Sequence, residues 1–396
     1  MLRRRAFWNN LTRYHRLRST PVDLPVSFGE FPKHFYNIKP SHATNLLDDR
    51  GRGDGREGII NNMAETRIRP SDEVVKENIK KWNIPQPDRE YTVLIHCTTY
   101  NHGKYIKDAL EGFVNQKSTY SFCAIIIDDC STDNNQEIIK EYAAKYPDII
   151  KPILLGENHM QRGILRDPYF EKWHQSAKYL AQCEGDDYWI DSLKLQRQVD
   201  FLETHQEYVA VAENGEELNI TTNEKSLFSD EKERDLTIDE MVIKRRFPTA
   251  SILYRSDIIG EDLKAFKITL DTGLWCYIAS KGKVRYFENV SSVYRRGCGV
   301  TITSDPYTFA LKCERMYLEI VDKLGNHFNT GLAYDAIYNG FLYSIPRYVH
   351  MRRFNRNFWN CIITCLKRRP LRFIAYMLKL FFKVVFVLPF SRFKGK

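Results

Sequence analysis

The chain has 396 residues, of which 43% are hydrophobic and 28% are charged, as in one large or two medium globular domains. A collagen, a disulfide-stapled mini-protein and a wholly disordered chain are excluded. The net charge is +9, but residues 346–396 hold 13 Lys and Arg and no Asp or Glu. The remaining residues contain 46 basic and 50 acidic side chains, so a mildly acidic body carries a basic tail that is attracted to phosphate groups.

The cysteines favour a reducing compartment, because there are nine of them and no Cys-x-x-Cys pair occurs. Met1–Arg18 has six arginines but no apolar core of a secretory signal. We therefore expect a cytoplasmic protein.

Residues 1–90 are predicted to form an N-terminal extension. The glycine-rich run Gly51–Gly58 predicts a loop or linker, because glycine weakens helices and strands. Ser71–Trp82 predicts a short helix, with Ser71 as its cap and Pro85 beyond its end.

From Tyr91 onward, apolar runs alternate with segments of helical spacing, about 30 residues apart. The predicted strands are Tyr91–Thr98, Phe122–Ile127, Ile149–Leu155 and Ala177–Gln182, and the predicted helices are Tyr105–Gln116 and Gln136–Tyr146. Continuous apolar runs are typical of strands covered on both faces. The pattern predicts an α/β fold with a mostly parallel central sheet and helices on both faces.

Further along, the patterns predict elements of mixed kinds. They are a helix at Leu193–Glu203, a mobile loop at Ser226–Asp239, strands at Phe247–Tyr254 and Val284–Tyr294, and a mostly helical Thr308–Phe341. We divide the chain into an extension (1–90), an α/β domain (91–300), a helical region (301–345) and a basic amphipathic tail (346–396).

Three polar clusters follow predicted strands, where ligands bind in open α/β sheets. They are Thr98–Asn101, Asp128–Asp133 and Glu184–Trp189. The second cluster could instead cap the helix that follows it. The third places three carboxylates within four residues, which repel one another unless a cation such as Mg²⁺ or Mn²⁺ joins them. A solvated turn is the structural alternative.

These three clusters, in this order and spacing, resemble the family 2 glycosyltransferases of the GT-A fold, and Ser192–Leu202 continues the similarity. The resemblance covers about residues 90–300.

The resemblance implies roles for single residues. Thr98 and Tyr100 match positions that hold the nucleotide base, and Asp128 matches an aspartate that bonds the uracil edge. Glu184-Gly-Asp186 matches the D-x-D motif, with Glu in place of the first Asp. Asp186, helped by Asp187, would hold Mn²⁺ or Mg²⁺ on the diphosphate, while Glu184 would lie near the ribose.

An inverting transfer also needs a carboxylate that takes the proton of the acceptor hydroxyl. The resemblance places this base well after the metal motif, and Leu270–Trp275 looks like that region. Asp271 is therefore the candidate catalytic base. The alternative is that Asp271 only caps a helix, and the two roles are compatible.

Two departures from the family pattern stand out. The N-x-G-x-x-x-A-R-N stretch after the third strand is replaced by Glu157–Arg162, where Arg162 or Arg166 could reach the diphosphate or simply be exposed. Arg295-Arg296 poses the same choice. The Q-x-x-R-W signature is absent, which argues against a polymer synthase with a built-in channel.

The basic tail has two apolar segments of helical spacing, separated at Pro370. The second, Phe373–Phe390, is shorter than the roughly 20 residues of a spanning helix. Arg372, Tyr376, Lys379 and Lys383 form a polar stripe on it, which favours a helix lying in a membrane interface. A spanning helix and a helix packed on the body remain alternatives.

The predicted protein is thus a metal-dependent inverting glycosyltransferase, peripheral on the inner face of the cell membrane. It would move a sugar from a nucleotide donor, UDP-linked, to a hydroxyl of a lipid-linked or cell-surface polysaccharide, as in polysaccharide or lipopolysaccharide biosynthesis. Nucleic acid is not an expected partner, because a phosphate-gripping tail would not need so many apolar residues. The alternatives are a nucleic-acid-binding protein, a non-catalytic nucleotide-sugar binder and a nucleotide-dependent oxidoreductase, which is disfavoured because no G-x-G-x-x-G follows the first strand.

Overall fold

The computed structural model describes residues 68–264, 266, 270–298 and 305–382 of the chain. The predicted linker Gly51–Gly58 lies outside these residues, as do Lys383 and the end of the apolar run Phe373–Phe390.

A short helix, α3 (Asp72–Lys81), precedes the sheet, as its sequence predicts. The Ser71 hydroxyl caps it by accepting a hydrogen bond from the backbone N–H of Val74. Val75 is buried in the hydrophobic core, and Trp82 packs against the same core. The last part of the predicted extension therefore belongs to the folded body.

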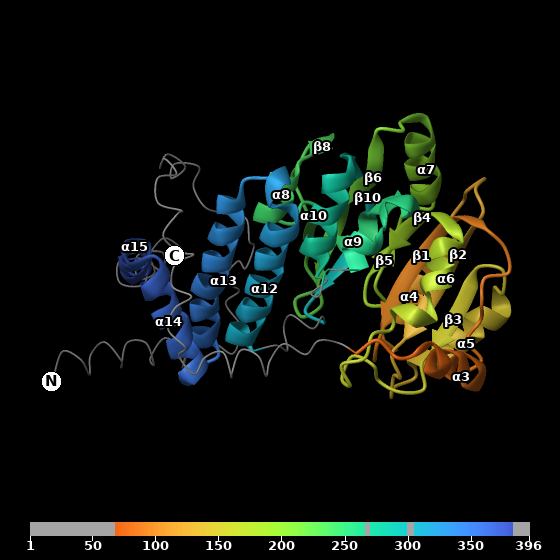
Figure 1. The fold of residues 1–396 in the computed structure, drawn as a ribbon, viewed down its shortest axis with the longest axis horizontal. Coiled ribbons are helices and arrows are strands. Elements are labelled where there is room, and N and C mark those ends of the chain that lie inside the picture. The colour runs from red at the N-terminus through yellow and green to blue at the C-terminus, as the bar shows by residue number, and fades with distance from the viewer. Residues whose placement is uncertain (1–67, 265, 267–269, 299–304, 383–396) are drawn as a thin grey trace, which may run out of the picture. The chain divides into compact units, whose positions relative to one another are not determined.

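The described residues form one mixed sheet of ten strands (Figure 1). The strands are β1 (Tyr91–Thr99), β2 (Phe122–Asp128), β3 (Ile150–Leu154), β4 (Ala177–Gln182), β5 (Tyr188–Trp189), β6 (Tyr208–Asn219), β7 (Lys225–Leu227), β8 (Arg234–Leu236), β9 (Leu253–Arg255) and β10 (Lys283–Arg296). Their order is β3-β2-β1-β4-β9-β6-β10-β5, with β7 paired to β6 and β8 to β10.

The half of the sheet from β3 to β4 is entirely parallel, as predicted. Its four strands match the predicted ranges to within one residue at each end. In the other half, β9 runs antiparallel to both β4 and β6, while β6 and β10 are parallel. The antiparallel β9 thus joins two parallel units into one sheet.

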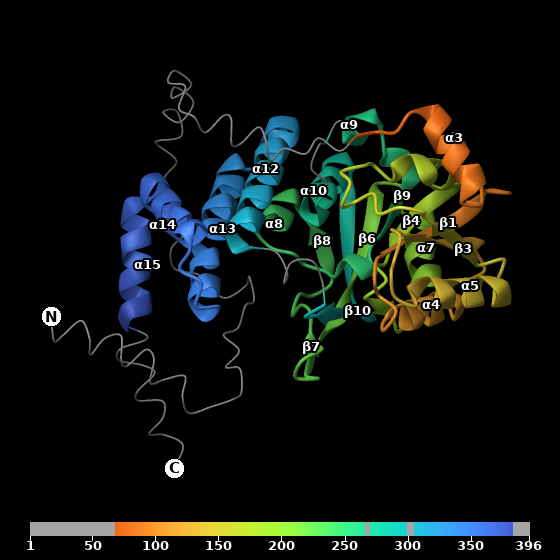
Figure 2. The same ribbon diagram turned by 90° about the horizontal axis from the view of Figure 1, so that it is seen from below.

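Helices cover both faces of the sheet (Figures 1 and 2). On one face, α4 (Ile106–Val114), α5 (Asn135–Lys145) and α7 (Lys194–Thr204) share a core with Val93 and Ile95 of β1. On the other face, α6 (Glu171–Gln175), α8 (Ile238–Ile243) and α10 (Asp271–Lys281) share a core with Leu94. Because neighbouring side chains of a strand point to opposite faces, these cores flank the sheet, and the α/β prediction is confirmed.

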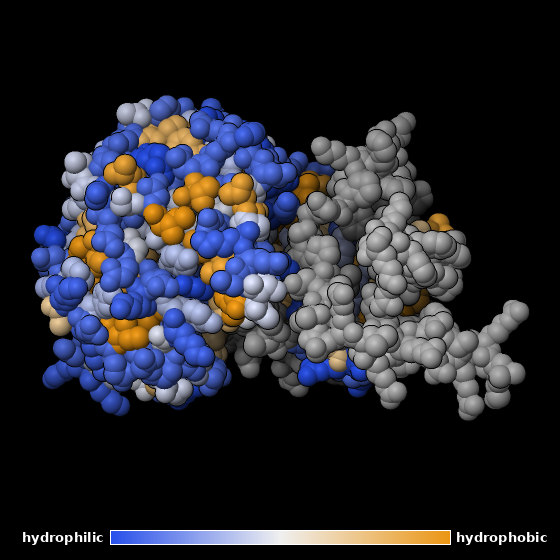
Figure 3. Space-filling model, turned by 180° about the vertical axis from the view of Figure 1, so that it is seen from behind, coloured by the Kyte–Doolittle hydropathy of each residue, from blue (hydrophilic) through white to orange (hydrophobic). Residues whose placement is uncertain are grey.

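Short elements complete the domain. They are α9 (Glu261–Lys264) and the 3₁₀ turns η2 (Asp167–Tyr169), η3 (Thr249–Ser251) and η4 (Ser256–Ile258). On the face seen in Figure 3, hydrophobic side chains form small patches separated by hydrophilic ones. The large apolar side chains of the sheet domain that are buried lie in the two cores.

The middle of the chain differs from its prediction in three places. Ser226–Asp239 is not one loop, because it contains most of β7, all of β8 and the start of α8, which Thr237 caps in a capping box with Glu240. Phe247–Tyr254 is not one strand, because η3 interrupts it before β9 begins. The long strand β6 is missing from the prediction. The three-residue strands β7, β8 and β9 are not predicted individually, because strands of this length are too short to show an alternating pattern.

In the described part of the chain after β10, the helices are α12 (Pro306–Leu324), α13 (Thr330–His350), α14 (Arg356–Arg368) and α15 (Pro370–Phe382), with the 3₁₀ turn η5 (Gly325–His327) after α12. Met316 and Ile320 of α12 reach the core of the sheet domain. The helices also share a third core, in which Phe341 of α13 and Phe358 of α14 are buried. None of the described helices combines the length and the apolar character that crossing a membrane requires.

The basic side chains at the junction of α14 and α15 contact the preceding helices. Arg368 pairs with Glu314 of α12, and Arg369 and Arg372 both pair with Asp335 of α13. Arg372 belongs to the predicted polar stripe, so the described start of that stripe contacts α13. The hydrophobic side chains left exposed on the two helices include Trp359 and Leu371.

Candidate functional site

The three polar clusters meet at one edge of the sheet because β1 lies between two parallel neighbours. Thr99 of β1 pairs in register with Asp128 of β2, and His96 pairs with Gln182 of β4. The chain segments that follow these strands therefore leave the sheet side by side.

Hydrogen bonds tie the loop after β1 to the loop after β2. The backbone N–H of Asn101 donates to the Ser131 hydroxyl, and the Asn101 side chain accepts from the backbone N–H of Thr132, both at 2.8 Å. The backbone N–H of Gly103 donates to Asp133 Oδ2 at 2.8 Å. Asp133 thus joins the two loops, and the two clusters form one rigid wall.

Asp128 is fully buried at the base of this wall. Its oxygens accept hydrogen bonds from the Ser131 backbone at 2.9 Å, the Asn135 amide at 2.7 Å and the Gln136 amide at 2.6 Å. The Ser131 hydroxyl donates to Asp128 as well. The carboxylate therefore holds the loop and the start of α5 together, and a nucleotide base would have to displace one of these donors to reach it.

The Thr98 and Tyr100 positions face the acidic turn and the loop after β3, respectively. The carbonyl oxygen of Thr98 accepts from the backbone N–H of Gly185 at 2.9 Å. The Tyr100 hydroxyl accepts from the Gln161 amide at 3.4 Å. A side chain at Gly185 would meet Thr99 Oγ1 at 2.6 Å, so only glycine lets the turn approach β1 this closely.

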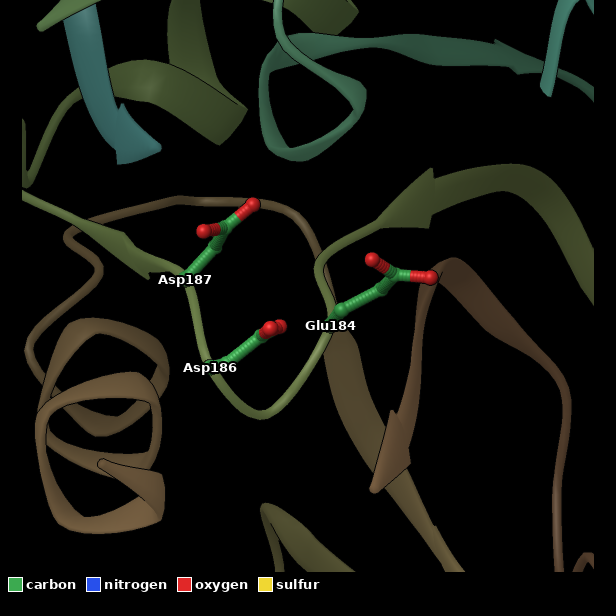
Figure 4. A group of neighbouring side chains, drawn as sticks. All are labelled: Glu184, Asp186 and Asp187. Atoms are coloured by element: carbon green, nitrogen blue, oxygen red, sulfur yellow. The ribbon is translucent and has the colours of Figure 1, made fainter. Parts of the chain in front are cut away.

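Glu184, Asp186 and Asp187 all arise from the turn between β4 and β5 (Figure 4). Each offers a carboxylate oxygen, and these oxygens lie within 4.8 Å of one another. Asp186 and Asp187 are buried, whereas Glu184 is exposed to solvent. The structure thus brings together the three acidic residues that the sequence predicts for the metal and the ribose.

Gathering these carboxylates disfavours their charged forms. Although part of the Glu184 side chain reaches solvent, desolvation of its carboxyl group, followed by the charges of Asp271 and Asp186, raises its pKa. Desolvation, followed by the charge of Asp186, raises the pKa of Asp187 well above its usual range. A divalent cation would relieve this repulsion, and oxygen ligands suit Mn²⁺ and Mg²⁺, so the donor set fits the predicted metal.

Arg295, near the end of β10, fixes the acidic turn. From the sequence, we expect it either to contact phosphate or to be exposed. Its backbone N–H donates to Asp187 Oδ1, and its guanidinium donates to the carbonyl oxygen of Asp186, both at 2.8 Å. The guanidinium also pairs with Asp108 of α4 and lies over the ring of Tyr188, 4.3 Å from its centroid. Only 7% of Arg295 is exposed, so its charge serves the turn.

Two further side chains lie beside Asp186 Oδ2. His102 Nε2 is 3.9 Å from this oxygen, and the Cys298 thiol donates to it at 3.6 Å. Neither residue is among the sequence-predicted site residues, because neither stands in a ligand-like spacing.

Asp271 is the first residue of α10, and its carboxylate lies close enough to the acidic turn to raise the pKa of Glu184. The Thr249 hydroxyl donates to Asp271 Oδ2 at 2.9 Å. Leu270 occupies the cap position of α10, so Asp271 is not the helix cap that the alternative interpretation expects. The predicted base therefore lies near the acidic turn that carries the predicted metal ligands.

The arginines after β3 have partners within the protein. Arg162 pairs with Glu157, and Arg166 lies 4.0 Å from Asp129 Oδ2. Arg296 pairs with Glu217 at 3.0 Å. Of the four arginines that the sequence nominates for the diphosphate, Arg295 and Arg166 are mostly buried beside the site, whereas the side chains of Arg162 and Arg296 are more than one third exposed.

Residues 95–253 match the family model Glycosyl transferase family 2. The matched segment runs from β1 to the first residue of β9, so it contains the acidic turn but not Asp271.

Two curated proteins and one solved structure illustrate the similarity. An uncharacterized protein of Mycobacterium tuberculosis is 34% identical over 199 residues, which are 50% of this chain and 57% of that protein. A Bacillus subtilis protein named "Putative teichuronic acid biosynthesis glycosyltransferase TuaG" is 24% identical over 235 residues, which are 58% of this chain and 88% of that protein. S. aureus TarS 1–349 in complex with UDP-GlcNAc has a TM-score of 0.51 at 16% identity, over 72% of this chain and 83% of that chain.

The chain spans little more than half the length of the mycobacterial relative. Because the sequence identity to the S. aureus structure is only 16%, the structural similarity establishes a shared fold and nothing more.

The bonds from Arg295 to Asp186, Asp187 and Asp108 form a clamp that should hold the acidic turn in place. Arg295→Gln removes the ion pair with Asp108 and the guanidinium bond to Asp186, and we expect the free energy of unfolding to fall by about 1–3 kcal/mol. The affinity for Mn²⁺ should fall as well, because the turn is no longer fixed. Urea denaturation and Mn²⁺ titration measure the two effects. Arg296→Gln, which removes a more exposed ion pair, is the control; equal effects of both changes would contradict the clamp.

Proposed function

Because this chain contains a glycosyl transferase family 2 domain of the GT-A fold, we propose that it is an enzyme that transfers a sugar from a nucleotide-sugar donor to a hydroxyl group. One observation carries the proposal: the three clustered carboxylates of the turn after β4 lie at the same sheet edge as Asp271. A metal site beside a separate carboxylate supplies the two things that this reaction needs, a charge partner for the diphosphate and a base.

Asp186 and Asp187 are the proposed metal ligands, with Glu184 at the rim of the same site. A bound Mn²⁺ or Mg²⁺ neutralises the negative charge that develops on the departing nucleoside diphosphate. The protein's own contribution is to hold the carboxylates within reach of one oxygen-preferring ion, and Arg295 does this by bonding both aspartates.

Asp271 is the proposed base of an inverting transfer. Its carboxylate takes the proton of the acceptor hydroxyl while that oxygen bonds to the anomeric carbon and the bond from this carbon to the diphosphate breaks. The Thr249 hydroxyl holds one carboxylate oxygen, which leaves the other for the proton. A base on a helix start is well placed, because the helix fixes its position.

We propose that the nucleotide lies against the wall formed by the loops after β1 and β2. Thr98 and Tyr100 would contact the base, and Asp128 would shape this pocket, since four internal donors already bond its carboxylate. A UDP-linked donor is proposed because a protein of the same fold binds UDP-GlcNAc. A lipid-linked or cell-surface polysaccharide acceptor is proposed by analogy with the name of the Bacillus subtilis relative.

The tail is proposed to attach the enzyme to the inner face of the cell membrane. Leu371 is 81% exposed, and Trp359, Ile363, Ile374 and Leu378 are each about half exposed. An apolar helix face of this kind, flanked by basic residues, binds at an anionic membrane interface. Nucleic acid is a weaker candidate, because Arg368, Arg369 and Arg372 already pair with acidic side chains of the protein.

The metal site is tested by titrating the protein with UDP in the presence of Mn²⁺. Asp186→Ala should weaken UDP binding by roughly tenfold or more, because Asp186 is one of the residues that would hold the ion for the diphosphate. Calorimetry measures the affinity. Asp148→Ala is the control, since Asp148 is exposed and lies before β3, at the opposite edge of the sheet. Unchanged binding in Asp186→Ala would refute the metal assignment.

The base is tested by Asp271→Asn, which keeps an oxygen for the Thr249 bond but cannot take a proton. UDP affinity should stay within about twofold of the original, while transfer falls by about 10²–10⁴-fold. Product formation with a panel of UDP-sugars and hydroxyl acceptors measures the rate. Retained turnover would remove Asp271 as the base, and lost UDP affinity would make it a binding residue instead.

Membrane attachment is tested by liposome flotation of the full chain. Leu371→Glu combined with Ile374→Glu should reduce the bound fraction on anionic vesicles more than tenfold, because burying each of these side chains contributes about 1.5–3 kcal/mol. Leu227→Glu is the matched control, since Leu227 is 61% exposed on β7. Equal flotation of both variants, or tight salt-sensitive binding to nucleic acid without flotation, would contradict the proposal.

A further inference from the structure

Arg245 lies between the last turn of α8 and η3, beside the proposed catalytic groups. Its guanidinium carbon is 5.4 Å from the ring centroid of Phe228 and 5.1 Å from that of Tyr294 on β10. Both distances are within cation–π range, so the two rings help to hold the guanidinium in place.

The hydrogen bonds of Arg245 run toward the proposed base. Its guanidinium donates to Thr249 Oγ1 at 3.3 Å, and the Thr249 hydroxyl donates to Asp271 Oδ2 at 2.9 Å. The Nε–H of Arg245 is buried and has no hydrogen-bond partner among the described residues. The side chain therefore has an unused donor and an indirect link to Asp271.

The charge of Arg245 is not neutralised by a direct ion pair within the described part of the chain. The next residue, Arg246, differs in this respect, because it pairs with Glu231 at 2.6 Å. Arg245 is half-buried, and a partly buried cation is costly without an anionic partner.

We propose that Arg245 is a second cationic group of the donor site, which binds the diphosphate of the nucleotide sugar opposite the metal ligands and holds Asp271 in place through Thr249. The proposal rests on the proposed function, because it names the protein group that meets the leaving diphosphate. A guanidinium suits this task, since its planar donors can bond two phosphate oxygens at once. When the sugar departs from the diphosphate, Arg245 shields the charge that stays behind.

The purely structural alternative is that Arg245 only fills the space between Phe228 and Tyr294. The two interpretations differ in what they predict for ligands of different charge. A diphosphate contact affects UDP much more than uridine or UMP, whereas a packing defect weakens all three ligands alike.

The test compares Arg245→Gln and Arg245→Lys with the neighbouring control Arg246→Gln in the full chain. Calorimetry with Mn²⁺ gives the affinities for UDP, UMP and uridine, and thermal unfolding shows that each variant folds. Arg245→Gln should weaken UDP binding by about 10- to 100-fold, the range expected for losing one charge-assisted hydrogen bond, and should weaken uridine binding less than twofold. Arg245→Lys should recover part of the UDP affinity, because it keeps the charge.

The outcomes separate this inference from the proposed function. If the unmodified protein binds UDP and Arg245→Gln binds it as tightly as Arg246→Gln does, the inference is overturned and the proposed function stands. Equal loss for UDP, UMP and uridine also overturns it, in favour of packing. If the unmodified protein binds no UDP with Mn²⁺, the proposed function fails and the inference fails with it. Should Arg245→Gln not fold, Arg245→Lys decides: unchanged UDP affinity and turnover would overturn the inference.

Discussion

The repulsion among Glu184, Asp186 and Asp187 is the constraint around which this end of the fold is built. Carboxylate oxygens within 4.8 Å of one another, two of them on buried residues, are unfavourable unless the surroundings hold them. Arg295 supplies that support from β10, a strand more than 100 residues further along the chain. Gly185 lets the same turn pack directly on β1. The mixed sheet thus matters for function because β10 brings Arg295 to a turn that β4 and β5 create.

The parallel half of the sheet and the acidic turn were predictable from local sequence alone. Continuous apolar runs gave β1 to β4 to within one residue, and the polar residues that follow them fall at one sheet edge as a consequence of parallel pairing. The choice of Asp271 as the base depends on the resemblance, and it stays a prediction, although the carboxylate of Asp271 does act on Glu184. These features depend on patterns within 10 to 20 residues, which a single sequence displays.

The remaining parts of the site depend on contacts that a single sequence does not display. The bonds from Arg295 to the acidic turn and from Arg245 through Thr249 to Asp271 join segments whose proximity depends on β9 running antiparallel between β4 and β6. Nothing local marks one arginine of the pair Arg245-Arg246 as ion-paired and the other as not. The four donors on Asp128 likewise come from the fold of its loop, so a strand-end aspartate that looks like a ligand contact can be mainly a structural residue.

The helices α14 and α15 present two kinds of surface: basic side chains that pair with the preceding helices, and apolar side chains that are exposed. The sequence predicts that the arginines of the tail attract phosphate groups. In the structure, Arg368, Arg369 and Arg372 pair with acidic side chains of α12 and α13. These contacts hold α14 and α15 against the preceding helices and turn the hydrophobic side chains of Leu371 and Ile374 outward. An outward apolar face that is fixed by ion pairs needs no further ordering before it meets a lipid surface, so less conformational entropy is lost on binding. In the proposed membrane attachment, the basic residues would act first by orienting the helices and only second by attracting anionic headgroups.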